Sequence, residues 1–296
     1  MKRLFPEIIL IILFVLVSLF SVLVAEVYQS AGVQPSSSSA VNLFYVLLLL
    51  SLTLVFTAAI LYVSRKRGFR LVRGAVLLVS IYATFIVAYA VAAITVSVVP
   101  MPSSAVLPVF LFIWFAIPGV LGYFALASRS FIVTDIIGFM LSAGFAAIWG
   151  LTLDVWFTVA LLVIFAMYDY ISVYKTKHMI KLAGLATSGS MNMLFVIPGS
   201  RDFDPNSKFE PDTEGKDQAA GTGILLGFGD VALPNVMIIS STIYGNYSLF
   251  PYFILPLIGA VAGMLALFIL TKKPAPGLPM LNAGVILGFL AALIIH

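Results

Sequence analysis

Two aspartates lie inside apolar stretches of this chain, where ionisable side chains are rare. Asp230 is in the run GILLGFGDVALPNVMII, residues 223–239, and Asp169 is in FAMYDYISVY, residues 165–174. A carboxylate at the centre of a membrane-spanning helix costs roughly 2.5–3.5 kcal/mol even on the lenient insertion scale. Such a residue is therefore expected to have a function and a partner close by.

The two carboxylates predict acid–base chemistry if they face each other. In a low-dielectric site they cannot both ionise, so they share one proton. The ionised carboxylate takes a proton from water while the neutral one donates to a carbonyl oxygen, each role typically contributing roughly 10²–10⁴ in rate. This is aspartic-protease chemistry, which requires neither a metal nor another cofactor. The chain has no cysteine, and its two histidines, His178 and His296, lie away from the aspartates in sequence, so no metal site is predicted.

The elements that must hold these aspartates are membrane-spanning helices. The 296 residues are 62% hydrophobic and 9% charged with a mean hydropathy of +1.14, which excludes a soluble globular protein. A spanning helix needs about 20 mostly apolar residues. Runs of that length predict an all-α polytopic membrane protein with nine transmembrane helices, at residues 5–25, 41–63, 73–98, 105–127, 132–150, 155–174, 219–243, 249–270 and 276–295.

The positive charges predict the orientation of these helices. All sixteen Lys and Arg precede the first helix or fall at every second connection, so they share one side of the membrane. Because basic residues are enriched in cytoplasmic loops, the N-terminus is predicted to be cytoplasmic and the C-terminus to be outside. Eight or ten helices would break this alternation.

One long connection divides the chain. Residues 1–174 form a six-helix part that carries Asp169, and residues 219–296 form a three-helix part that carries Asp230. Residues 175–218 are predicted to form a cytoplasmic loop, partly disordered because its second half is charged and poor in apolar residues. Within this loop, MNMLFVI at 191–197 fits equally a strand edge for an unwound substrate and an interfacial anchor.

The two aspartates are predicted to lie at one depth. Asp169 is six residues before Lys175, about 9 Å from the cytoplasmic end of its helix at 1.5 Å per residue. Asp230 is about 18 Å deep if the next helix begins directly after Gln218. Glycines weaken helix, so the embedded part is expected to begin near Ile224, which also places Asp230 about 9 Å deep.

A second function also fits two intramembrane acids. Without further motifs, such residues more often mark a cation or proton pathway than a protease, so a transporter or channel is the alternative. Transporters are expected to have discontinuous helices in matching halves, whereas only one glycine-broken helix is predicted here. A purely structural pairing is disfavoured because two buried acids are costly.

Three short motifs favour the protease. Tyr168-Asp169 resembles the YD motif of presenilins and signal peptide peptidases, Gly227-Phe228-Gly229-Asp230 resembles their GxGD motif, and Pro276-Gly277-Leu278-Pro279 resembles their PAL motif. A lone YD carries little information, but the three motifs in this order on the sixth, seventh and ninth helices are specific. Over residues 167–281 the chain therefore resembles the GxGD family of intramembrane aspartyl proteases, and its compact length is similar to that of a prokaryotic presenilin-like homologue.

The resemblance implies a hydrolase that cuts peptide bonds within transmembrane helices, with Asp169 and Asp230 as the catalytic pair. Tyr168, the residues at 227–229 and the segment 276–279 would shape the site or bind substrate. Gly277 departs from the family, which has alanine there, and the predicted topology is that of presenilins rather than of signal peptide peptidases. The expected partners are transmembrane-helix proteins and the lipid bilayer of the cell membrane, with no nucleic acid. The chain could act alone, and a homo-oligomer stays open.

Overall fold

The computed structural model describes residues 5–65, 69–127, 131–172, 194–197, 224–270 and 277–295. Within these ranges the chain forms helices and one two-stranded sheet, so the predicted all-α class holds for almost all of them. The elements are α1 (Phe5–Ser30), α2 (Ser39–Arg65), α3 (Phe69–Val98), α4 (Ser103–Ala127), α5 (Phe131–Thr152), α6 (Val155–Ile171), β1 (Leu194–Ile197), β2 (Ile224–Gly227), α8 (Phe228–Tyr244), the π-helix η3 (Leu249–Phe253), α9 (Ile254–Leu270) and α10 (Leu278–Ile295).

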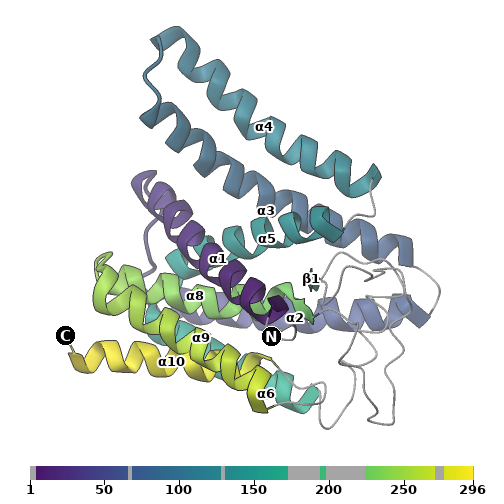
Figure 1. Ribbon diagram of the computed structural model, residues 1–296, viewed down its shortest axis with the longest axis vertical. Helices are drawn as coiled ribbons and strands as arrows, with labels where there is room; N and C mark the ends of the chain where they lie inside the picture. The colour runs from purple at the N-terminus through teal and green to yellow at the C-terminus, as the bar shows by residue number, and fades with distance from the viewer. Residues whose placement is uncertain are drawn as a thin grey trace.

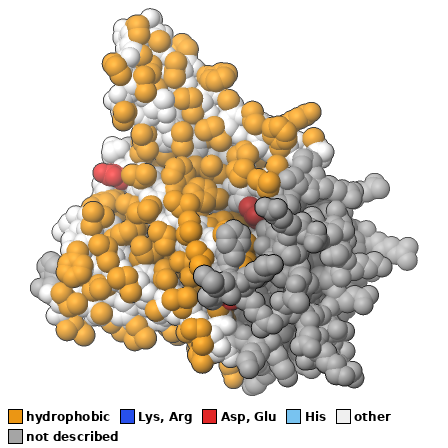
Figure 2. All heavy atoms as spheres, viewed as in Figure 1, with side chains coloured by type: hydrophobic (Ala, Val, Ile, Leu, Met, Phe, Trp, Pro, Cys, Tyr) orange, Lys and Arg blue, Asp and Glu red, His pale blue; other side chains and the backbone are white. Residues whose placement is uncertain are grey.

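The length and composition of the helices suit a lipid bilayer. In the described part of the chain, six helical stretches are long and apolar enough to cross a membrane: α1, α3, α4, α5, the η3–α9 unit and α10. Large apolar side chains are exposed along them, and Figure 2 shows hydrophobic side chains over most of the described face. Soluble proteins rarely expose so continuous an apolar surface, whereas contact of this surface with lipid tails is not unfavourable. The protein is an integral, multi-pass membrane protein.

Helix α8 lies at the centre of the bundle. Every residue from Val231 to Thr242 is buried, so the helix has no lipid-facing side. It packs against α1, α5, α6 and α10, and Figure 1 shows it crossing the middle of the molecule while α3 and α4 project from one side. The helix that carries Asp230 is therefore held on all sides by other helices.

Helices α9 and α10 form an antiparallel pair whose backbones touch. A Cβ added at Gly259 would lie 2.9 Å from the carbonyl carbon of Gly284, and one added at Gly263 would lie 3.2 Å from the Cα of Leu281. Glycines allow this close approach, which is a common way to join helices in membranes. The contact fixes the start of α10 relative to the rest of the bundle.

Several helix ends meet on the side of the bundle that the predicted topology places outside. The backbone N–H of Ser36, between α1 and α2, donates to the carbonyl oxygen of Thr152 at the end of α5, at 3.2 Å. The Asn42 amide donates to the Ser36 carbonyl at 2.7 Å and accepts from the backbone N–H of Asp154 at 3.2 Å. These contacts agree with the alternation of helix directions. Of the sixteen Lys and Arg on which the predicted orientation rests, Arg65, Arg70 and Arg73 are in α2 and α3, and the other thirteen lie outside the described residues.

The seventh predicted helix begins later in the structure than in the sequence analysis. Residues Ile224–Gly227, expected to be helical, form β2, and the helix starts at Phe228. Strand β2 pairs antiparallel with β1, with Leu194 opposite Gly227. Glycine weakens helix, and β1 supplies the hydrogen bonds that an extended segment needs. The predicted depth of about 9 Å for Asp230 counted a helical rise from Ile224, so it does not apply to a segment that is a strand up to Gly227. Residues 194–197 form a strand, and its use as an edge for substrate stays a prediction; the rest of the loop lies outside the described residues.

Candidate active site

Asp169 is almost completely enclosed. It lies on the buried face of α6 together with Thr158, Leu162 and Phe165, and its side chain is 1% exposed. Its Oδ2 accepts a hydrogen bond from the backbone N–H of Leu278 at 3.2 Å. Its Oδ1 is buried and has no hydrogen-bond partner among the described residues. One carboxylate oxygen is thus held in place, and the other has unused hydrogen-bonding capacity.

Asp230 lies at the start of α8, where the chain turns from strand to helix. Gly227 is the N-cap residue, and its backbone N–H donates a hydrogen bond to the Asp230 carboxyl group. An acidic residue in the first turn is favoured because the first N–H groups of a helix are unpaired and carry partial positive charge. The side chain is half-buried, so it is more accessible than Asp169.

The structure brings these two carboxyl groups together. Asp230 is the third residue of α8, and Asp169 is the third residue from the end of α6. The two helices are in contact, and the consecutive residues Gly277 and Leu278 lie against Asp230 and Asp169, respectively. Residues 61 positions apart in sequence therefore form one acidic pair at the ends of two helices.

The start of α10 touches both members of the pair. A Cβ added at Gly277 would lie 3.3 Å from Cγ and from Oδ2 of Asp230, while the N–H of Leu278 reaches Asp169. The Leu278 side chain is buried in an apolar cluster with Leu161. The segment that carries the PAL-like motif thus lies beside the carboxyl groups. Pro276 is outside the described residues.

The remaining motif residues differ in their surroundings. A Cβ at Gly227 would lie 3.2 Å from Oδ2 of Asp230, whereas one at Gly229 would meet nothing within 4 Å. Phe228 points away from the pair and is buried against α5 and β1. Tyr168 is half-buried beside Asp169 in sequence. Among the described glycines of the GxGD and PAL-like motifs, Gly229 is the one with open space around it.

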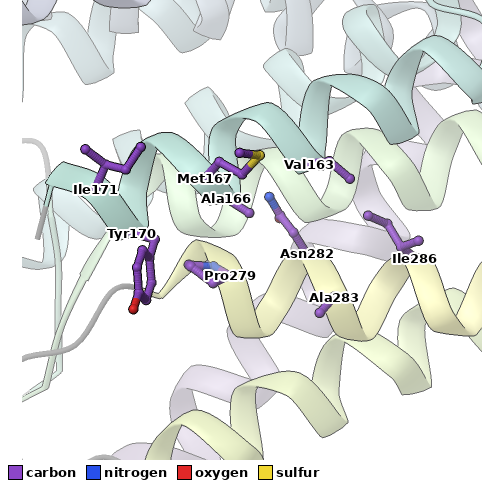
Figure 3. A pocket seen from close by; sticks show the side chains of 9 residues that line it. All are labelled: Val163, Ala166, Met167, Tyr170, Ile171, Pro279, Asn282, Ala283 and Ile286. Carbon is purple, nitrogen blue, oxygen red and sulfur yellow. The ribbon is translucent and has the colours of Figure 1, made fainter. Parts of the chain in front are cut away.

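A pocket of about 350 Å³ lies between α6 and α10; Tyr170 and Pro279, which follow Asp169 and Leu278 in sequence, line it, whereas neither aspartate does. Figure 3 shows the Asn282 side chain reaching from α10 toward α6, where its Nδ2 donates to the Leu162 carbonyl oxygen at 2.9 Å. Sequence reasoning missed Asn282, although a polar residue one turn after Leu278 in an apolar helix was a usable signal. The pocket is lined by Val163, Ala166, Met167, Tyr170, Ile171, Pro279, Asn282, Ala283 and Ile286.

The described residues contain no group of three or more His, Asp or Glu side chains that could hold a metal ion.

Comparison with known proteins identifies the family. The family profile described as "Signal-peptide peptidase, presenilin aspartyl protease" matches residues 11–296. The chain belongs to this family. A search of curated proteins returns no match.

Two solved structures share the fold of this presenilin-family protein. Both are described as structures of a presenilin family intramembrane aspartate protease, one in space group C222 and one in P2. The first is 23% identical with a TM-score of 0.61 and covers 98% of both chains. The second is 25% identical with a TM-score of 0.60 and covers 97% of this chain and 96% of that one. The protein is a hydrolase of the intramembrane aspartyl protease class, which favours the protease over the transporter.

Proposed function

We propose that Asp169 and Asp230 together hydrolyse peptide bonds within the transmembrane helices of other membrane proteins. The observation that carries this proposal is the meeting of both carboxyl groups at the start of α10, in a chain of the presenilin family. The ionised member of the pair takes a proton from a water molecule, whose oxygen attacks the carbonyl carbon of the scissile bond. The protonated member donates to the carbonyl oxygen. Collapse of the tetrahedral intermediate then breaks the C–N bond: the leaving nitrogen takes the proton that the first carboxylate removed from water, and the second carboxylate takes back the proton of the intermediate's hydroxyl group.

The place of Asp230 at a helix start supports a supply of water to this site. Helix α8 has 17 residues, so it is about 26 Å long at 1.5 Å per residue. A bilayer core is about 30 Å thick. Because Asp230 is the third residue of α8, it does not need to be far from an aqueous surface.

The small sheet supports a way to hold the substrate. A peptide bond inside a helix is shielded, so the substrate must unwind, and its freed N–H and C=O groups then need partners. Strand β2 ends at Gly227, three residues before Asp230, and Gly229 faces open space. We propose that an unwound substrate adds as a strand to the β1–β2 sheet and places its scissile bond beside the pair.

We further propose the presenilin orientation, with the N-terminus cytoplasmic, nine crossings and the C-terminus outside. The distribution of the sixteen Lys and Arg supports it, and so do the contacts that join the ends of α1 and α5 to the starts of α2 and α6. Substrates would then enter with their N-terminus outside. In this topology residues 1–174 and 219–296 each supply one aspartate, and the loop 175–218 joins them in the cytoplasm.

Cleavage of a reporter with a single apolar span tests the function directly. The purified protein in detergent is incubated with several such reporters, and the products are analysed by mass spectrometry. We expect fragments whose new ends lie within the span. Intact reporters, together with cation flux into liposomes that depends on both aspartates, would contradict the protease and support the transporter.

A further inference from the structure

Phe228, the variable residue of the GxGD motif, packs against α5. Phe228 is 5% exposed, and its ring lies over Gly138: a Cβ added there would be 2.6 Å from Cζ and 2.7 Å from Cδ1 of the ring. On its other side the ring meets Phe195 of β1, with centroids 4.7 Å apart and planes at 69°. Only a residue without a side chain at 138 leaves room for this ring.

A second contact holds the backbone of the same residue. Ser142 is four positions after Gly138 and therefore lies on the same face of α5. It is fully buried, and its Oγ donates to the Phe228 carbonyl oxygen at 3.2 Å. Helix α5 thus holds Phe228 by both its side chain and its main chain.

These contacts matter because the start of α8 has no side-chain cap. The N-cap residue is Gly227, which makes no side-chain capping bond. A cap normally contributes roughly 0.5–2 kcal/mol to the start of a helix. The first turn must therefore be held by other contacts. Helix α5 supplies two of them, both to Phe228. Asp230 follows two positions later, so a displacement of Phe228 moves the carboxyl group with it.

We propose that Gly138 and Ser142 are positioning residues for Asp230. The inference rests on the proposed protease function. It identifies the face of α5 that contacts Phe228 as the surface that sets the position of Asp230. Neither residue is placed against the carboxyl pair by any contact in the described structure; both act through Phe228.

A size-swap experiment tests this inference. In Gly138→Ala the new methyl group displaces the Phe228 ring, and we expect kcat for reporter cleavage to fall about tenfold or more with little change in KM, because small misplacements of catalytic groups are that costly. Phe228→Leu in the Gly138→Ala background removes ring atoms at the point of collision, and we expect it to restore most of the lost kcat. Ser142→Ala adds no atoms and should lower kcat in the same direction.

Gly150→Ala is the matched control. Gly150 is on the same α5–α8 interface, where a Cβ would lie 2.6 Å from the Cβ of Ile239 and 2.9 Å from the Val236 carbonyl oxygen. It is about 18 Å along α5 from Gly138 at 1.5 Å per residue. We expect both glycine variants to lose thermal stability, but only Gly138→Ala to lose more kcat than its stability explains.

A second measurement separates positioning from folding. A peptide in which a carbon unit bearing a hydroxyl group replaces the scissile amide mimics the tetrahedral intermediate. The affinity of each variant for this peptide should therefore fall in parallel with kcat/KM in Gly138→Ala and Ser142→Ala. Equal losses of kcat in Gly150→Ala and Gly138→Ala, or no recovery with Phe228→Leu, would overturn the inference. Absence of cleavage by the unsubstituted protein would contradict the proposed function itself.

Discussion

The backbone N–H of Leu278 donates a hydrogen bond to Oδ2 of Asp169, at 3.2 Å. The preceding residue, Gly277, lies against the carboxyl group of Asp230. Two consecutive residues at the start of α10 therefore contact one aspartate each. This arrangement explains how a short motif on a third helix can govern a pair of acids that come from two others.

Replacing Leu278 with proline tests the hydrogen bond to Asp169. Leu278 is the first residue of α10, a position where proline fits helix geometry and removes only the N–H. Hydrogen bonds to charged groups contribute about 1.5–3 kcal/mol, so we expect Leu278→Pro to lose on the order of tenfold or more in kcat. Leu278→Ala keeps the N–H and loses the side-chain packing. If the alanine variant were as inactive as the proline variant, packing rather than the bond would explain the loss.

Gly277 sets how much space the Asp230 carboxyl group has. A methyl group at this position would lie 3.3 Å from Cγ and Oδ2 of Asp230, close enough to require a small shift of that side chain. Because the neighbour is a side-chain end, we expect Gly277→Ala, which restores the family's usual residue, to keep kcat/KM within about tenfold. The larger Gly277→Val should abolish cleavage. Equal rates for valine and glycine at this position would show that the segment is not against Asp230 in the working enzyme.

Asn282 links α10 to α6 and lines the pocket between these two helices. Its Nδ2 donates to the Leu162 carbonyl oxygen, and its Oδ1 is buried without a partner in the described part of the chain. Hydrogen bonds between membrane helices contribute about 0.6 kcal/mol on average and up to about 1.7 kcal/mol. We expect Asn282→Ala to lower the free energy of unfolding by an amount in this range, measured by denaturation in mixed micelles. Ser51→Ala, at an exposed position on α2, is the control and should have no effect.

The turn between α8 and η3 should respond to alkaline pH. Burial, and then the charge of Glu26, raise the pKa of Tyr247 from 10.0 to about 12. The folded state thus holds this proton more tightly than the unfolded state. The contribution of Tyr247 to stability is complete below pH 10 and is lost as the pH rises through 12. Tyr247→Phe cannot ionise, so its stability should fall less over that interval. Parallel losses in both proteins, measured by thermal unfolding at each pH, would contradict the shifted pKa.

The sequence was sufficient for the parts of this protein that depend on composition and on spaced motifs. Apolar runs located the helices, and Asp169 and Asp230 were singled out because acids are expensive in lipid. The extended segment before Phe228 was missed because its apolar residues fit a helix or a strand equally, and the pairing partners in β1 are 27 to 33 positions away.

The contact between the Phe228 ring and Gly138 also could not be predicted from the sequence. In a membrane protein both the lipid-facing and the core-facing sides of a helix are apolar, so periodicity does not show which face is buried. Gly138 and Ser142 stand out only when the fold brings α5 against α8. The same is true of Asn282, whose partner Leu162 is 120 positions away in sequence.

The most direct test of the account is reporter cleavage by Asp169→Asn and Asp230→Asn, each compared with the unsubstituted protein at equal amounts of folded material. Asparagine keeps the shape of the side chain and removes the acid. The account predicts that each single substitution abolishes cleavage, since one carboxyl group cannot serve as both acid and base in the same step. Cleavage at an undiminished rate by either variant would contradict the two-aspartate mechanism.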